Sequence, residues 1–138
     1  MFFLLISVVS GLTEDKVDDY CYLFSSNYVQ GLTESIKGHI STYPELDAEK
    51  VTSKAIEQAF YSCIRNLKEE HVKKFNFQNI HDFSLYNDFI SLDLGKFQSN
   101  EDLKLTKKFN DKRKQIAERA REKSNNKKKN DELNGKDL

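Results

Sequence analysis

The chain has 138 residues, of which 38% are hydrophobic and 32% are charged. This length leaves room for one domain and a tail, and the composition is polar for a compact globule, so a large multidomain core is excluded. The formal net charge is zero, but residues 12–103 hold 9 Lys and Arg against 16 Asp and Glu, whereas residues 104–138 hold 13 against 6. An acidic body therefore precedes a basic tail, and the two either attract each other or serve different partners.

Residues 1–11 form an apolar segment, MFFLLISVVSG, without a charged side chain. The run is too short to cross a bilayer, which requires about 20 apolar residues in a helix. It fits the hydrophobic region of a secretory signal peptide, with the small residues Ser10 and Gly11 near a cleavage point. We therefore predict a signal peptide over residues 1–11. No Lys or Arg precedes the run, so a buried first strand and a retained apolar anchor are the alternatives.

The first helix of the body follows an acidic stretch at residues 13–19. Carboxylates favour a helix N-terminus because they interact with the positive end of the helix dipole. The residues that follow place an apolar side chain at every third or fourth position, which is the helical period. This stripe consists of Val17, Cys21, Phe24, Tyr28, Leu32 and Ile36. We expect Gly31 to mark the close approach of another segment, and Gly38 to end the helix in a left-handed conformation.

A turn at residues 39–46 separates this helix from a second one. Pro44 lacks a backbone donor and disfavours a helical residue before it, so the first helix must stop there. Asp47 is placed to cap the second helix by accepting a backbone hydrogen bond. The apolar stripe of this second helix consists of Val51, Ile56, Ala59, Phe60, Cys63 and Leu67, and it includes Val72 if the helix continues that far.

The chain's two cysteines, Cys21 and Cys63, each lie on one of these apolar stripes. Cys21 lies 16 residues before Lys37 and Cys63 lies 16 residues after Asp47. At 1.5 Å per residue, both are about 24 Å from the turn. Antiparallel helices therefore bring the two side chains to the same height on facing sides, which predicts a disulfide. Two buried free thiols in a reducing compartment are the alternative.

A third, aromatic-rich helix is expected over residues 80–94, starting near Asp82 and ending before Gly95. Its apolar side chains would cover the hairpin, because two helices alone bury too little surface to be stable. We therefore assign the helical domain to residues 12–97.

A fourth, charged helix is expected over residues 98–124, with Ser99 as its cap. Nothing apolar recurs in residues 125–138, where we expect a disordered basic tail. The chain ends in Lys-Asp-Leu, which resembles an ER-retention signal but lacks its glutamate in register.

No motif in the sequence carries recognisable catalytic or metal-binding chemistry. The histidines, His39, His71 and His81, do not share a helical face, and a zinc site needs about four ligands. The two cysteines lack the electropositive surroundings that activate a thiol, and phosphate-binding and calcium-binding loops are absent. We therefore expect no catalytic residue, no metal and no cofactor, and we predict that the protein is not an enzyme.

The basic segment is the strongest compositional signal, because its side chains can neutralise phosphates or contact an anionic lipid surface. A solvated helix is the alternative, since Asp111, Glu118 and Glu122 lie among the cations at helical spacing. The candidate anion contacts are Lys107, Lys108, Lys112, Arg113, Lys114, Arg119, Arg121, Lys127, Lys128 and Lys129.

The sequence as a whole predicts an all-α protein: a helical hairpin closed by one disulfide, a short third helix, a long charged helix and a tail. We expect a non-enzymatic binding or structural component of the secretory pathway, either extracellular or in the ER lumen. An unknown protein is the expected partner, with an anionic polymer or membrane surface as a further partner of the tail. No small-molecule substrate is indicated. The alternative is an intracellular or organellar subunit of a larger complex that uses its basic helix to contact RNA or an anionic membrane.

Overall fold

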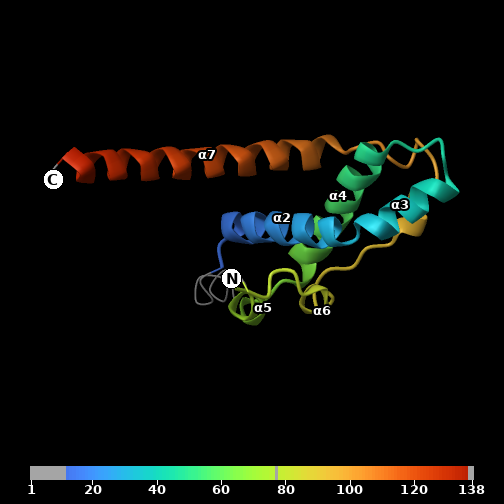
Figure 1. Ribbon diagram of the computed structural model, residues 1–138, viewed down its shortest axis with the longest axis horizontal. Helices are drawn as coiled ribbons and strands as arrows, with labels where there is room; N and C mark the ends of the chain where they lie inside the picture. The colour runs from blue at the N-terminus through green and yellow to red at the C-terminus, as the bar shows by residue number, and fades with distance from the viewer. Residues whose placement is uncertain (1–11, 77, 137–138) are drawn as a thin grey trace, which may run out of the picture. The chain divides into compact units, whose positions relative to one another are not determined.

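The computed structural model describes residues 12–76 and 78–136, with side chains described as far as residue 126 (Figure 1). The predicted signal peptide at residues 1–11 lies outside the described residues. The chain divides into two units that meet between Leu105 and Thr106. The first holds α2 (Glu14–Gly31), α3 (Thr33–Thr42), α4 (Ala48–Asn66), α5 (Glu69–Lys74), α6 (Phe83–Tyr86) and the 3-10 helix η1 (Leu94–Lys96). The second is α7 (Lys107–Lys136), so the described fold is all-α, as predicted.

The first predicted helix is present as two consecutive helices. Helix α2 begins after Thr13, whose side chain accepts a hydrogen bond from the Lys16 amide at 3.2 Å. The break falls at Leu32, between α2 and α3, where the backbone leaves helical geometry directly after Gly31. A glycine is the least helix-favouring residue apart from proline, so a break beside it is inexpensive.

The predicted left-handed cap at Gly38 is wrong, because Gly38 lies inside α3. Helix α3 continues to Thr42 and ends at Tyr43, the residue before Pro44. The proline therefore stops the helix as predicted, through its missing donor and its restriction of the preceding residue.

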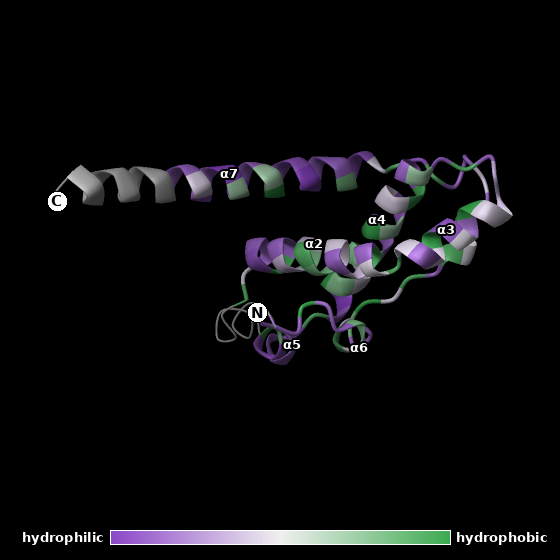
Figure 2. Ribbon diagram, in the orientation of Figure 1, coloured by the Kyte–Doolittle hydropathy of each residue, from purple (hydrophilic) through white to green (hydrophobic). Residues whose placement is uncertain are grey.

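The disulfide Cys21–Cys63 joins α2 to α4, and it closes the expected hairpin. The chain runs out along α2 and α3 and returns along α4, which crosses α2 at an angle (Figure 1). Asp47 caps α4 as predicted, accepting a hydrogen bond from the Lys50 amide at 3.1 Å. Both cysteines are fully buried, so the bridge lies inside the core. Figure 2 shows mixed hydropathy along α2 and α4, and mostly hydrophilic residues in the coloured part of α7.

The predicted third helix over residues 80–94 is a single turn, α6, which Asp82 caps as expected. The segment after it fails to continue as a helix because α4 binds its backbone. The Ser62 hydroxyl accepts from the Ser91 backbone amide at 2.9 Å, and the Gln58 side-chain Oε1 accepts from the Asp93 backbone amide at 2.6 Å. These side-chain bonds replace the ones that a helix would have supplied.

An aromatic cluster closes the side of the hairpin next to α6. The ring of Phe75 lies 4.6 Å from that of Phe24 and 5.0 Å from that of Tyr86, between centroids. Phe89 contacts both Phe24 and Phe75. The fully buried Tyr86 donates its hydroxyl hydrogen to the Ile80 carbonyl. Desolvation raises the pKa of this hydroxyl, so Tyr86 remains a donor.

Helix α7 begins at Lys107, nine residues after the predicted start at residue 98. Ser99 does not cap a helix but closes a turn, in which its hydroxyl accepts from the Asp102 amide at 3.3 Å and donates to the Asp102 carboxylate at 3.0 Å. Helix α7 as described continues past residue 124 to Lys136. The disordered tail expected at residues 125–138 stays a prediction.

Substituting Gly31 should destabilise the protein, because a Cβ there would lie 1.6 Å from the ring of Phe83. The ring must move away from its contacts with Tyr28 and Tyr86 to relieve this overlap. We expect Gly31→Ala to lower the free energy of unfolding by about 1–3 kcal/mol, despite the better helix propensity of alanine. Urea denaturation followed by circular dichroism measures the change.

Gly38→Ala is the matched control, since Gly38 is also helical but nothing lies within 4 Å of the position that its Cβ would take. We expect this variant to be up to about 1 kcal/mol more stable than the wild type. Equal effects of the two substitutions would contradict the close packing of Phe83 on Gly31.

Removing the disulfide should lower the free energy of unfolding, mainly because the unfolded chain gains conformational entropy. The bridge spans a sequence separation of 42 residues, and closing a loop of that length is worth about 4 kcal/mol. We expect the double variant Cys21→Ala/Cys63→Ala to lose about 3–5 kcal/mol, including the lost packing of two buried sulfurs. Urea denaturation of the oxidised, reduced and double-variant proteins checks this, and a reduced protein as stable as the oxidised one would contradict it.

Candidate functional site

An apolar groove with a volume of about 290 Å³ opens between α2 and the segment around α5. Its size is close to the lower end of the range for ligand sites, about 300–1,000 Å³. The residues that line it are Tyr20, Leu23, Phe24, Val72, Phe75, Asn76 and Ile80. Apolar side chains predominate, and Tyr20 and Asn76 contribute the polar groups. The groove therefore suits an apolar occupant with few hydrogen-bonding demands.

Helix α2 forms one wall through residues three and four positions apart, which share a helix face. Tyr20 stacks on Phe24 with ring centroids 6.0 Å apart. Leu23 is 48% exposed, the one large hydrophobic side chain with so open a position among the described residues. Phe24 is buried and belongs also to the aromatic cluster. The floor of the groove is thus the outer side of the core, and Leu23 stands at its rim.

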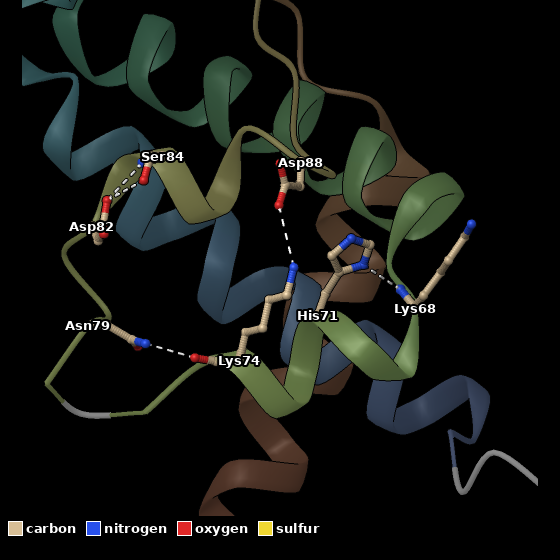
Figure 3. Close-up of polar contacts among 7 residues, drawn as sticks. All are labelled: Lys68, His71, Lys74, Asn79, Asp82, Ser84 and Asp88. Atoms are coloured by element: carbon tan, nitrogen blue, oxygen red, sulfur yellow. Dashed lines mark hydrogen bonds and ion pairs between the residues drawn. The ribbon is translucent and has the colours of Figure 1, made fainter.

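The short helix α5 forms the opposite wall, and His71 holds its first turn. The His71 Nδ1 accepts a hydrogen bond from the Lys68 amide at 3.0 Å (Figure 3). This bond satisfies one of the amides that the start of a helix leaves unpaired. The imidazole also packs on the ring of Phe89, with centroids 4.9 Å apart. His71 therefore links the wall of the groove to the aromatic cluster.

Polar contacts hold the chain between α5 and α6 in place. The Asn79 side-chain amide donates to the Lys74 carbonyl at 2.7 Å, and the Asp82 carboxylate accepts from the amide and hydroxyl of Ser84 (Figure 3).

Lys74 also forms an ion pair with Asp88 at 3.9 Å. Both ends of this pair are half-exposed, so solvent screening leaves it little stabilising effect. The hydrogen bonds are what position Phe75 and Ile80 at the groove.

The predicted anion contacts do not gather on one face. All lie on α7, and at 100° per residue their positions are distributed around the helix. Lys107, Lys108, Lys114 and Arg121 are exposed, whereas Lys112, Arg113 and Arg119 are partly buried. The guanidinium of Arg113 lies 5.7 Å from the ring centroid of Phe109, a cation–π contact. The side chains of Lys127, Lys128 and Lys129 lie outside the described part of the chain.

Two of the histidines make contacts that stabilise the fold. The His39 ring is hydrogen-bonded to the Phe97 carbonyl, and His71 caps α5. Within the described residues, no three His, Cys, Asp or Glu side chains lie together as a metal would require. No helix in residues 12–76 and 78–136 has the length and apolarity to span a bilayer.

Sequence reasoning missed the groove, although signals for it exist. Leu23 precedes Phe24 on the predicted helix and widens its apolar face. Val72 and Phe75 are spaced by three residues, which indicates a helical face. The sequence analysis placed Val72 at the far end of the second helix and left residues 73–79 unassigned, whereas α4 ends at Asn66 and Val72 lies in α5. What the sequence could not provide was the tertiary contact that places this stretch against α2.

Comparison of the chain with family models, with curated proteins and with solved structures finds no match. The function must therefore be argued from the groove and the disulfide themselves.

Replacing His71 should loosen α5 selectively. His71→Ala removes the acceptor of the Lys68 amide and the contact with Phe89. Losing a helix cap costs about 1 kcal/mol, so amide hydrogen exchange in α5 should accelerate about fivefold. Hydrogen–deuterium exchange with peptide-level mass spectrometry measures this, and His81→Ala, at an exposed position, is the control. Unchanged exchange in α5 would contradict the capping role.

Proposed function

We propose that the protein is a non-enzymatic component of the secretory pathway that acts by contact, as a binding or structural protein. The observation that carries the proposal is the apolar groove on a body braced by a buried disulfide. A rigid scaffold beside an apolar, partly exposed surface is what recognition of an apolar partner requires.

The chemistry of the groove supports binding over catalysis. Among the described residues, its lining offers a phenol and an amide but no carboxylate, imidazole, thiol or amine. General acid–base catalysis and nucleophilic catalysis both use such groups, held within hydrogen-bond reach of the reacting atoms. Desolvation of an apolar partner is the effect that this lining can provide.

The compartment is supported by the disulfide. Disulfides persist in the ER lumen and outside the cell, and they are rare where glutathione keeps thiols reduced. Cys21 and Cys63 are both fully buried, so the folded protein shields the bridge from exchange. The apolar segment at residues 1–11 is independent support, because it fits a targeting signal.

Expression of the full chain in a secreting eukaryotic cell tests the proposal. We expect the product in the medium, with an N-terminus near Leu12 and an intact mass that is two hydrogens below that of the dithiol. The control is Cys63→Ser, which should lower the secreted amount because the bridge stabilises the fold. A product retained in the cytosol, beginning at Met1 and carrying two alkylatable thiols, would overturn the proposal and favour the intracellular alternative.

A further inference from the structure

We propose that the groove binds a small neutral amphiphile, a molecule with an apolar body of about ten to twelve carbon atoms and one hydrogen-bond acceptor. The inference rests on the proposed role of the groove as a contact site, and it names the class of ligand that the site takes. It depends on three observations: the size of the groove, the surface around it, and the hydrogen-bonding groups in its lining.

The size of the groove sets the size of the ligand. An engineered protein cavity of about 150 Å³ holds one benzene ring, which has six carbon atoms. The groove has a volume of about 290 Å³, so by the same ratio it holds about ten to twelve carbon atoms. Tyr20, Phe24 and Phe75 contribute three aromatic rings to the lining. Contacts between rings favour a flat ligand body, such as a fused pair of aromatic rings.

The surface around the groove favours a small molecule over a protein. A stable protein interface buries about 800 Å² on each partner, and its centre is apolar. Among the large hydrophobic side chains in residues 12–76 and 78–126, only Leu23 is exposed. The described surface therefore lacks an apolar patch of the extent that a protein interface needs, whereas a small ligand needs only the groove itself.

The lining supplies hydrogen-bond donors without a charge. The Asn76 Oδ1 accepts from the backbone amides of Gln78 and Asn79 at 2.9 and 3.0 Å, so the side-chain nitrogen of Asn76 is the group that can donate to a ligand. The hydroxyl of Tyr20 can also donate. No charged side chain occurs in the described lining, and an ionised ligand would lose its hydration there without gaining a counter-charge. A neutral acceptor, such as the carbonyl of a ketone or an ester, is therefore the polar group that fits.

A series of naphthalenes tests these requirements on the purified, oxidised full chain. The reporter is a fluorescent acetylnaphthalene with a dimethylamino group, whose emission shifts to the blue when it leaves water. The competitors are acetylnaphthalene, ethylnaphthalene and naphthoate, which share one ring system and differ in the polar group. We expect saturable binding of the reporter. The ketone should displace it about three- to tenfold better than the hydrocarbon, which is the effect of one hydrogen bond, and at least about tenfold better than the carboxylate.

The donors are tested by the double variant Tyr20→Phe/Asn76→Asp. This variant keeps the ring at position 20 and an oxygen at position 76 that accepts the two backbone amides, but it removes both donors. We expect it to bind the ketone no better than the hydrocarbon. A preference for the ketone that survives in this variant would contradict the assigned donors.

The location of the ligand is tested by Leu23→Glu, which places a charge at the rim and should weaken binding of the ketone about fivefold or more. Leu23 is half-exposed, so the fold tolerates the change. Leu94→Glu is the matched control, since Leu94 is a partly exposed leucine in η1 that does not line the groove. Circular dichroism and the urea midpoint confirm that the variants are folded.

A lack of saturable binding by the neutral ligands would overturn the inference. Equal displacement by the ketone, the hydrocarbon and the carboxylate would also overturn it, and so would a Leu23→Glu variant that binds like Leu94→Glu. These outcomes are independent of the secretory proposal, because they are measured on purified, oxidised protein. A protein found reduced in the cytosol would refute the proposed compartment and leave the binding result standing.

Discussion

The crossing of α2 and α4 at the buried Cys21–Cys63 bridge is the constraint on which the first unit depends. A polar chain of this size has little apolar surface to bury, and small domains are marginal for that reason. The bridge lowers the conformational entropy of the unfolded chain. It therefore reduces the stabilising free energy that burial in the core must supply. Segments that follow α4 are short and irregular, and they gain their positions by packing on this crossing. The scaffold is the hairpin, and the remaining segments of the first unit are attached to it.

Helix α4 organises those segments with a polar stripe as well as an apolar one. Gln58, Ser62 and Asn66 recur every four residues, and their side chains bind the backbone of residues 89–93. Ser62 is almost fully buried, so its hydroxyl needs the partners that Ser91 supplies. The stripe fixes Phe89 against Phe24, and through it the aromatic cluster and the floor of the groove.

Local signals made part of this structure predictable. Asp47, Asp82 and Pro44 act within a few residues of their own positions, so the sequence identifies the starts of α4 and α6 and the end of α3. The disulfide was predicted correctly because each cysteine lies on the apolar face of its helix. The argument from equal heights was wrong, since the first helix breaks at Leu32 and continues to Thr42 instead of ending at Lys37. The shortness of α6 was not predictable, since the side chains that interrupt it belong to α4, far away in the sequence. The groove was missed for the same reason: its two walls meet only in the tertiary structure.

The two walls of the groove differ in how firmly the rest of the fold holds them. One wall belongs to α2, which the bridge holds directly. The other wall is α5, six residues long, whose first turn depends on the bond from the Lys68 amide to His71. A short helix with few anchoring bonds opens locally at a lower cost than the whole fold. We therefore expect α5 to open locally at a lower cost in free energy than α2, because α2 carries Phe24 and is held by the Cys21–Cys63 crossing.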